Sequence, residues 1–225
     1  QITVVTQRAV RESNPATAAD MIANTGEVFV QKSQAGGGSP RLRGFAANNV
    51  LMVVDGVRMN NALYRTGNLQ NLIQLDANAV ESAEVLFGPG SVHYGSDALG
   101  GVMVFTTRTP QYSDNGFAYA GGTLTRASSA TSELTQGADL ELRWKGLATY
   151  TSVTASRFGD VTSGSTMPSS APSFGLRQWY VSQFNGRDSQ VVNSNPHQQR
   201  NSGYDQLNVI QKFSIALAPN WDLGL

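Results

Sequence analysis

Strict alternation of apolar and polar residues in the second half of the chain is the feature that most limits its fold. Charged and amide residues such as Glu141 and Lys212 stand between apolar positions in two segments. The apolar positions are Leu140, Leu142, Trp144, Leu207, Val209, Phe213, Ile215 and Leu217. A period of two residues predicts extended strands with one apolar and one polar face. Residues 117–126 and 147–158 and the C-terminal end bring the total to about five predicted strands.

The connections between these strands alternate in length. Tight turns are predicted at residues 145–146 and 218–220, and longer loops at residues 127–136 and 159–204. Strands of about ten residues, with short turns at one end and long loops at the other, are typical of a transmembrane β-barrel. A soluble β-sandwich also fits the alternation and is left open by it.

Aromatic residues fall at the tight-turn end of the predicted strands. Trp144 and Trp221 stand beside the two turns, and Phe117 and Tyr119 begin the first strand at the same end. Aromatic residues of this kind gather where a membrane protein meets the lipid–water interface, so they predict one aromatic girdle. Five strands cannot close a barrel, because single chains use about eight or more, so we expect a fragment. No signal peptide precedes Gln1, which fits a processed or truncated start rather than a cytosolic protein.

Composition excludes several classes of protein. Sixteen basic residues balance sixteen acidic ones, so the chain lacks the basic surface expected of a nucleic-acid-binding protein. Cysteine is absent, which excludes disulfides, thiol nucleophiles and thiolate metal sites. His93 and His197 are the only histidines, too few for a zinc enzyme of the usual kind. We therefore expect no catalytic residues, no metal site, no cofactor and no enzymatic activity.

Residues 1–110 are predicted to form a compact α+β unit, followed by a linker at residues 110–115. The predicted strands are residues 2–6, 28–30, 50–54, 57–59, 85–87 and 102–107. Asp55-Gly56 lies between two of these runs and is a strong signal for a hairpin turn. Asn14-Pro15 is predicted to begin a helix that Gly26 ends. Asp76 is predicted to cap a second helix at residues 77–82.

A nucleotide site is a rival interpretation of the same unit, because glycines between Gly88 and Gly101 follow a predicted strand. The segment lacks the Gly-Lys-Ser/Thr ending of a phosphate-binding loop, and His93 stands where a dinucleotide fingerprint has Gly or Ala. The simpler interpretation is that these glycines form turns that need a positive φ and that His93 is structural.

Three segments, taken in order, resemble the plug domain of TonB-dependent outer-membrane receptors. They are residues 40–45 (PRLRGF), 50–58 (VLMVVDGVR) and 84–102 (EVLFGPGSVHYGSDALGGV). The resemblance implies an α+β plug domain at residues 1–110. It further implies that residues 111–225 are the first strands, about five, of an antiparallel transmembrane β-barrel. The chain would then be a fragment of a plugged barrel of about 22 strands.

The resemblance also implies active import of a scarce nutrient across the outer membrane of a Gram-negative bacterium. Members of the family capture ferric siderophores, haem or cobalamin, and the plug blocks the lumen until TonB pulls on an N-terminal TonB box. No TonB box is recognisable before Ile2, so TonB is expected to bind a segment missing here. The expected partners are TonB, a small nutrient such as an iron chelate, and outer-membrane lipid. The tight turns are expected in the periplasm and the long loop outside the cell.

Charged residues stand among the apolar strands of the predicted plug: Arg41, Arg43, Arg58, Glu81 and Glu84. A buried charge is costly unless it is paired, so these side chains could simply lie on a solvated face. The interpretation that the resemblance favours is polar contact between the plug and the lumen wall, which includes Asp139, Glu141 and Arg143.

Outward-facing loops are expected to bind the nutrient, because loops on a rigid scaffold carry specificity. The candidate substrate-binding residues are Gln34, Asn48, Asn49, Asn60, Asn61, Tyr64 and Arg65. Their amide, phenol and guanidinium groups suit a polar or anionic chelate. Haem importers of the family often have a histidine at the place of Asn68. An iron chelate such as a ferric siderophore is therefore favoured, with haem and cobalamin as alternatives.

Two other functions stay open at this point. An outer-membrane receptor could instead bind a protein through the long loop, which contains Trp179, Tyr180, Phe184 and Tyr204. A soluble two-domain protein with a nucleotide site is the third alternative. A signal peptide, a TonB box and further alternating strands in the full-length gene would exclude that third alternative.

Overall fold

The computed structural model describes residues 1–32, 36–45, 49–59, 71–88, 91–95, 98–218 and 221–224. The chain divides into two compact units. The first contains Gln1–Gly122, Asp139–Val153 and Asn208–Leu225, and the second contains Thr123–Ala138 and Thr154–Leu207. Within the described ranges, no helix combines the length and apolar character that crossing a membrane requires. The domain boundary near residue 110 stays a prediction.

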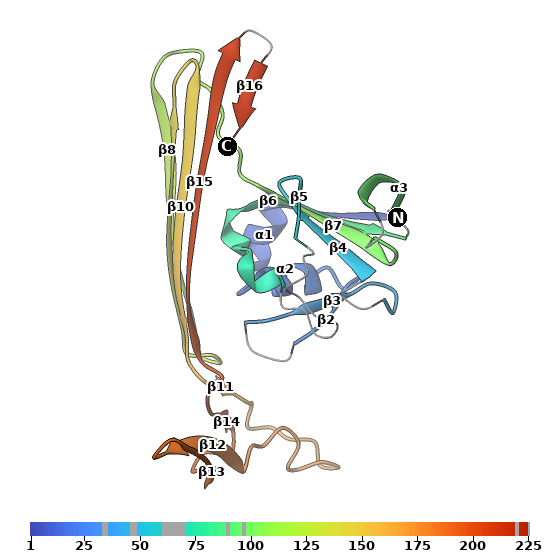
Figure 1. Ribbon diagram of the computed structural model, residues 1–225. Helices are drawn as coiled ribbons and strands as arrows, with labels where there is room; N and C mark the ends of the chain where they lie inside the picture. Colours follow the sequence, from blue (N-terminus) through green and yellow to red (C-terminus); the bar gives the residue numbers. More distant parts are fainter. Residues whose placement is uncertain are drawn as a thin grey trace. The chain divides into compact units, whose positions relative to one another are not determined.

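A five-stranded sheet, which we call the N-terminal sheet, organises residues 1–107 of the first unit (Figure 1). Its strands are, in spatial order, β1 (Ile2–Thr6), β6 (Val80–Phe87), β7 (Gly101–Thr107), β4 (Val50–Val54) and β5 (Val57–Arg58). β4 and β7 are parallel, and the other neighbours are antiparallel. The predicted strands at residues 2–6 and 50–54 are confirmed, whereas β6 is longer than predicted because it begins at Val80.

The predicted hairpin turn at Asp55-Gly56 joins β4 to β5. Both residues have positive φ, 48° for Asp55 and 82° for Gly56. Two successive positive φ values define a type I′ turn, whose twist matches that of the flanking strands. The prediction is therefore confirmed together with its turn chemistry.

Two short helices, α1 (Gln7–Ser13) and α2 (Ala18–Ala23), lie on one face of the N-terminal sheet (Figure 1). Thr6 caps α1 by accepting a hydrogen bond from the Ala9 amide. Thr17 caps α2 by accepting from the Asp20 amide at 3.1 Å, and its hydroxyl donates to the Asp20 carboxylate at 2.8 Å. This reciprocal pair satisfies an amide that the helix cannot satisfy itself.

The predicted helix start at Asn14-Pro15 is wrong. Asn14 is instead the C-cap of α1, with φ 42° in the left-handed region and its amide bonded to the Val10 carbonyl. Asn is one of the few residues other than glycine that adopts this conformation readily. Its side chain was interpreted as an N-cap because Asn suits both roles.

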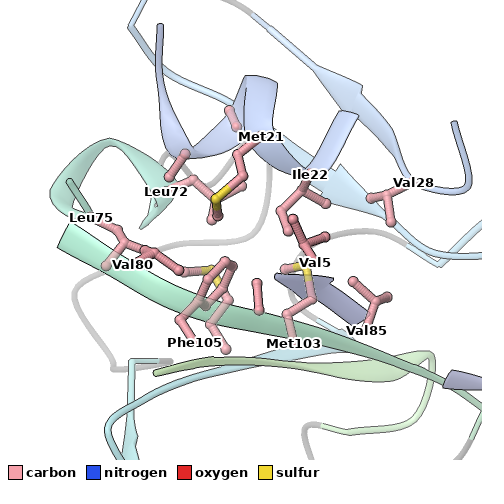
Figure 2. Packing of buried hydrophobic residues seen from close by; sticks show 14 of the residues in the cluster. Val5, Met21, Ile22, Val28, Leu72, Leu75, Val80, Val85, Met103 and Phe105 are labelled. Atoms are coloured by element: carbon pink, nitrogen blue, oxygen red, sulfur yellow. The ribbon is translucent and has the colours of Figure 1, made fainter. Parts of the chain in front are cut away.

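The apolar core of the first unit lies between α2 and the N-terminal sheet (Figure 2). Met21 and Ile22 of α2 face Met103 and Phe105 of β7, and all four side chains are buried. Leu72 of the 3₁₀ helix η2 (Asn71–Gln74) contributes to the same cluster. Each such side chain stabilises the fold by about 1.5–3 kcal/mol, so this cluster holds the helices and the sheet together.

Short elements complete the unit. Strands β2 (Phe29–Gln31) and β3 (Ser39–Arg41) form an antiparallel ribbon. Asp76 caps η3 (Ala77–Ala79) as predicted, but that helix ends three residues early because Val80 begins β6. A smaller cluster, Leu51, Val53, Ala98 and Val102, packs with Tyr94 of α3 (Ser91–Tyr94). β4 contributes to both clusters, as its uninterrupted apolar run indicates.

A second sheet, the C-terminal sheet, contains the five predicted strands. In spatial order they are β16 (Trp221–Gly224), β15 (Tyr204–Ala218), β10 (Leu147–Phe158), β9 (Glu133–Arg143) and β8 (Ala118–Ser128). The turn between β8 and β9 covers only residues 129–132, so the longer loop predicted there is wrong.

The segment at residues 159–204 contains strands that the sequence did not predict. β11 (Val161–Thr162) pairs with β14 (Gln198–Gln199), and β12 (Trp179–Phe184) pairs with β13 (Arg187–Val192). These pairs turn much of the predicted loop into a short stem and a hairpin, both within the second unit.

Candidate functional site

The exposure of the C-terminal sheet is the reverse of that in a soluble protein. Apolar residues at alternating positions are exposed, such as Leu140 at 44% and Leu207 at 68%. Polar residues between them are buried, such as Glu141 at 1% and Ser152 at 6%. This arrangement is the one expected of a wall between lipid and a polar lumen. We call the two sides the apolar face and the polar face.

Three of the four residues predicted to form an aromatic girdle lie together. The Phe117 ring lies 5.1 Å from that of Trp144 and 6.2 Å from that of Tyr119, measured between centroids. All three are exposed, next to the tight turn at residues 145–146. The side chain of Trp221, the fourth residue, lies outside the described part of the chain.

Polar side chains join the end of β7 to the polar face of the C-terminal sheet, all within the first unit. We call this cluster the polar junction; it contains Asp55, Thr107, Arg108, Gln111, Asp139, Glu141, Arg143 and Lys212. Because it joins the two sheets, it is the candidate functional site that the described residues provide.

Arg108 follows β7 and contacts two strands of the polar face. Its guanidinium donates to the Asp139 carboxylate at 3.1 Å and lies 3.8 Å from the Glu141 carboxylate. It also stacks over the Tyr150 ring, 5.4 Å from the centroid. A Cβ at Gly122 would lie 3.2 Å from the Asp139 carboxylate, so a glycine there leaves this acid room. The Arg108 guanidinium is thus held both by the two carboxylates and by the face of the Tyr150 ring.

Glu141 is the most deeply buried acid of the junction. Its carboxylate accepts from the Gln111 amide at 2.8 Å and from the Arg143 guanidinium at 2.7 Å. A carboxylate with 1% of its side chain exposed needs such partners, because an unpaired buried charge is strongly destabilising. Glu141 therefore ties the residues after β7 to β9.

The predicted linker lies along the polar face. The Ser113 amide donates to the Trp144 carbonyl at 3.1 Å, and the Ser214 hydroxyl donates to the Pro110 carbonyl at 3.3 Å. The Tyr112 hydroxyl donates to Asp222 at 3.1 Å. Burial, together with the hydrogen bond to the Asp222 carboxylate and its charge, raises the pKa of Tyr112. Each of these bonds fixes a different residue, so the linker is ordered.

Asp55, in the hairpin turn, meets Lys212 of β15. The Asp55 carboxylate accepts from the Thr107 amide at 2.8 Å and from the Thr107 hydroxyl at 2.6 Å. The Lys212 ammonium lies 3.0 Å from the same carboxylate and donates to the Thr107 carbonyl at 3.2 Å. Asp55 after β4, Thr107 at the end of β7 and Lys212 in the middle of β15 thus form one polar cluster.

The five residues predicted to contact the wall lie elsewhere in the first unit. Arg41 donates to Gln31 at 2.5 Å, and Arg43 donates to Gln1 at 3.0 Å and stacks 5.2 Å from the centroid of the Phe87 ring. Arg58 is exposed and close to Gly95, and Glu81 and Glu84 are exposed on β6. Their contact with the wall stays a prediction. Of the predicted wall residues, Asp139, Glu141 and Arg143 do take part in the junction.

Most of the predicted substrate-binding residues lie outside the described residues. These are Gln34, Asn48, Asn60, Asn61, Tyr64 and Arg65. Asn49 is described: it precedes β4, and its carbonyl accepts from the Gly100 amide at 2.8 Å. The binding role of all seven stays a prediction.

Sequence reasoning did not identify Arg108, Asp55 or Lys212 as contact residues. The sequence did contain a signal for Lys212: it is a cation at a polar-face position of a strand, and such a cation needs a partner when it is buried. Asp55 was interpreted through its turn alone. Arg108 has no local pattern, since its partners are about 30 positions away in the sequence.

A buried ion pair stabilises the polar face within the second unit. Arg126 donates to Glu133 at 2.6 Å, with 7% and 2% of the two side chains exposed. Thr135 donates to the same carboxylate at 2.8 Å. This network links β8 to β9 close to the turn at residues 129–132.

Side-chain amides hold the segment at residues 159–204 together. Asn193 is buried and donates to the Arg177 carbonyl at 2.9 Å and to the Gln198 carbonyl at 2.8 Å. The Ser163 amide donates to the His197 carbonyl at 2.8 Å, which extends the β11–β14 stem. Among the described residues, no three His, Asp or Glu side chains come together as metal ligands would.

Comparison with known proteins matches residues 1–102 to the family described as the TonB-dependent Receptor Plug Domain. A vitamin B12 transporter BtuB of Vibrio vulnificus is 39% identical over 109 residues, 47% of this chain and 17% of that protein. A hemin receptor of Yersinia pestis is 36% identical over 107 residues, 47% of this chain and 15% of that protein. A ferrioxamine receptor of Yersinia enterocolitica is 33% identical over 121 residues, 51% of this chain and 16% of that protein.

Solved structures share the fold over nearly the whole chain. The copper transporter OprC has a TM-score of 0.70 at 13% identity, over 97% of this chain and 28% of that protein. The ferric enterobactin receptor PfeA of Pseudomonas aeruginosa has a TM-score of 0.61 at 16% identity, over 99% of this chain and 32% of that protein. The chain thus spans about a third or less of these proteins, and the fold predicted from the alternation and the three motifs is confirmed.

Proposed function

We propose, on the premise that this chain is part of a TonB-dependent receptor with its plug domain at residues 1–102, that the whole protein imports a scarce nutrient across the bacterial outer membrane. The proposed partner that supplies energy is TonB, acting through a segment outside this sequence. We place the tight turns in the periplasm and the segment at residues 159–204 outside the cell.

One observation carries this proposal. A plug domain is followed directly by strands whose apolar face is exposed and whose polar face is buried. A soluble enzyme would bury the apolar side, because burial of apolar surface drives folding in water. The combination supports a wall that faces lipid and encloses a polar lumen occupied by a plug.

The proposed nutrient is a ferric siderophore or another iron chelate. The candidate ligands at residues 59–68 are two asparagines, a tyrosine and an arginine, which suit an oxygen-rich anion. A relative named as a ferrioxamine receptor and a structural neighbour named as a ferric enterobactin receptor support this class.

Cobalamin or haem is the second candidate. Two other relatives are named as a vitamin B12 transporter and as a hemin receptor. These matches cover about half of this chain and less than a fifth of each relative, whereas loops along the whole barrel also take part in selecting a nutrient. A receptor for a protein is the third candidate, favoured by Trp179, Val181 and Val192, which are more than half exposed on one face of the β12–β13 hairpin.

Growth of a strain that lacks the receptor tests the three candidates. The strain is supplied with a ferric siderophore, haem or cobalamin as the only source of iron or cobalamin, with and without TonB. Loss of growth on one source, restored by the intact receptor and dependent on TonB, identifies the nutrient. Growth on every source at the wild-type rate would reject nutrient import and favour the receptor for a protein.

A further inference from the structure

The Asp55-Gly56 turn carries a charge that the turn itself does not require. Asn-Gly forms a type I′ turn as well as Asp-Gly does, and asparagine could also accept from the Thr107 amide. Neither the turn nor the hydrogen bond from the Thr107 amide therefore requires a negative charge at residue 55. Its orientation is fixed, because the Asp55 amide donates to the Phe105 carbonyl at 2.9 Å and the carboxylate accepts twice from Thr107.

Lys212 brings the matching charge from the C-terminal sheet. It lies on the polar face of β15, and its neighbour Phe213 is exposed on the apolar face. Its ammonium is 3.0 Å from the Asp55 carboxylate and 3.2 Å from the Thr107 carbonyl. An ammonium has three donors and no acceptor, so two of the three are directed at the end of the N-terminal sheet.

We propose that Lys212 is a positioning residue that seats the Asp55 turn against the wall, and that this pair keeps the lumen closed to solutes along that edge of the plug. The inference rests on the proposed function, since only a plug inside a lumen has a leak to prevent. It assigns a role to the charge of the Asp-Gly motif, which the turn alone does not explain.

The partial exposure of the Asp55–Lys212 pair suits a contact that has to break when the turn moves away from the wall. The side chains of Lys212 and Asp55 are 18% and 32% exposed, against 7% and 2% for the Arg126–Glu133 pair. A partly exposed pair is weaker and is screened by salt. The Asp55–Lys212 pair is thus strong enough to hold the Asp55 turn in place and weak enough to break when the turn moves.

The test uses the full-length receptor in the outer membrane of living cells. The variants are Asp55→Asn, Lys212→Met, the double variant and Lys212→Arg. The matched control is Arg157→Met, which breaks the exposed Arg157–Asp205 pair, with 78% and 68% of those side chains exposed. The readout is uptake of a glycopeptide antibiotic that an intact outer membrane excludes.

Asp55→Asn and Lys212→Met should each raise uptake several-fold, and the double variant should leak no more than either single variant. Lys212→Arg and Arg157→Met should remain at the wild-type level. Equal leak in Lys212→Met and Arg157→Met would overturn the proposal. So would a double variant that leaks as much as the two single effects combined.

A second measurement covers variants that insert poorly. Wild-type receptor in lipid vesicles should leak more of a trapped dye at high salt than at low salt, because salt screens the pair. A wild-type leak that does not change with salt would overturn the proposal. TonB-dependent growth of the wild-type strain is scored in parallel. A wrong role for the Asp55–Lys212 pair is thereby distinguished from a wrong proposal of nutrient import.

Discussion

The Gln111 amide donates to the Glu141 carboxylate at 2.8 Å, which joins the linker after the plug to the second strand of the wall. The Glu141 carboxylate also accepts a hydrogen bond from the Arg143 guanidinium, and 1% of the Glu141 side chain is exposed. A single, almost fully buried acid thus holds a backbone amide and a cation. The consequence can be measured by removing the acid.

Glu141→Ala should lower the free energy of unfolding in detergent by about 1–3 kcal/mol, because it leaves the Gln111 backbone amide and the Arg143 guanidinium without their acceptor. Denaturant titration of the full-length receptor measures this change. Asp205→Ala is the control, since that acid belongs to an exposed pair and should cost about 0–1 kcal/mol. Equal effects of the two substitutions would show that the junction adds nothing to stability.

Gly56→Ala should destabilise the hairpin by about 1–2 kcal/mol, because an alanine in the left-handed region is strained. A Cβ at Gly56 would meet nothing within 4 Å, so the cost comes from its φ of 82° alone. Gly146 is the matched control: its Cβ would also meet nothing, and its φ is not positive in that range. Thermal unfolding that shifts equally for Gly56→Ala and Gly146→Ala would contradict this account of the turn.

Leu140→Arg should reduce the free energy of folding into lipid vesicles by about 2–4 kcal/mol, because an arginine near the bilayer midplane is costly. Leu140 is 44% exposed on the apolar face of β9. Leu134→Arg, on the same face but one residue from the start of the strand, should cost only about 0–1 kcal/mol. If the two arginines cost the same, the apolar face does not contact lipid at these depths.

The elements that the sequence predicted are those with a strong local pattern. The run at residues 50–54, the Asp-Gly turn and the alternation in β9 and β15 each determine the local structure without help from distant residues. α1 was missed because Val10 is its only buried residue, so it has no apolar period to recognise. The helix start was placed at Asn14 although Thr17 and Asp20, three residues apart, formed a better signal.

The contacts of the junction depended on information that the local sequence does not contain. Arg108 meets Asp139 and Tyr150 only once two sheets are packed together. β12 was missed because aromatic residues stand at both its exposed and its half-buried positions, so its sequence does not alternate between apolar and polar residues. The outward loops stay predictions for a different reason, since they lie outside the described residues.

Asn193→Ala should make residues 164–176 more sensitive to protease added to intact cells. The buried Asn193 amide donates to two carbonyls that close the hairpin, and its loss leaves both without that donor. In the wild type, protease should cut residues 164–176 before it cuts residues 1–110, because that stretch has no strand and is mostly exposed. Asn195→Ala is the control on the same segment. Rapid cutting of the plug with an intact segment would reverse the proposed orientation.

Tyr64→Ala combined with Arg65→Ala should weaken binding of the nutrient by about 2 kcal/mol or more, if these side chains make charge-assisted contacts with it. Both residues follow the β4–β5 hairpin in the sequence, and an anchor of that kind lowers the entropy lost on binding. Titration of the purified full-length receptor with the nutrient identified by growth measures the change. Asn60→Ala with Asn61→Ala separates turn formation from binding, because asparagines that only shape the turn would leave the affinity unchanged. Surface expression of both double variants should match the wild type. Wild-type affinity in the Tyr64 and Arg65 variant would place the binding residues in barrel loops instead of the plug.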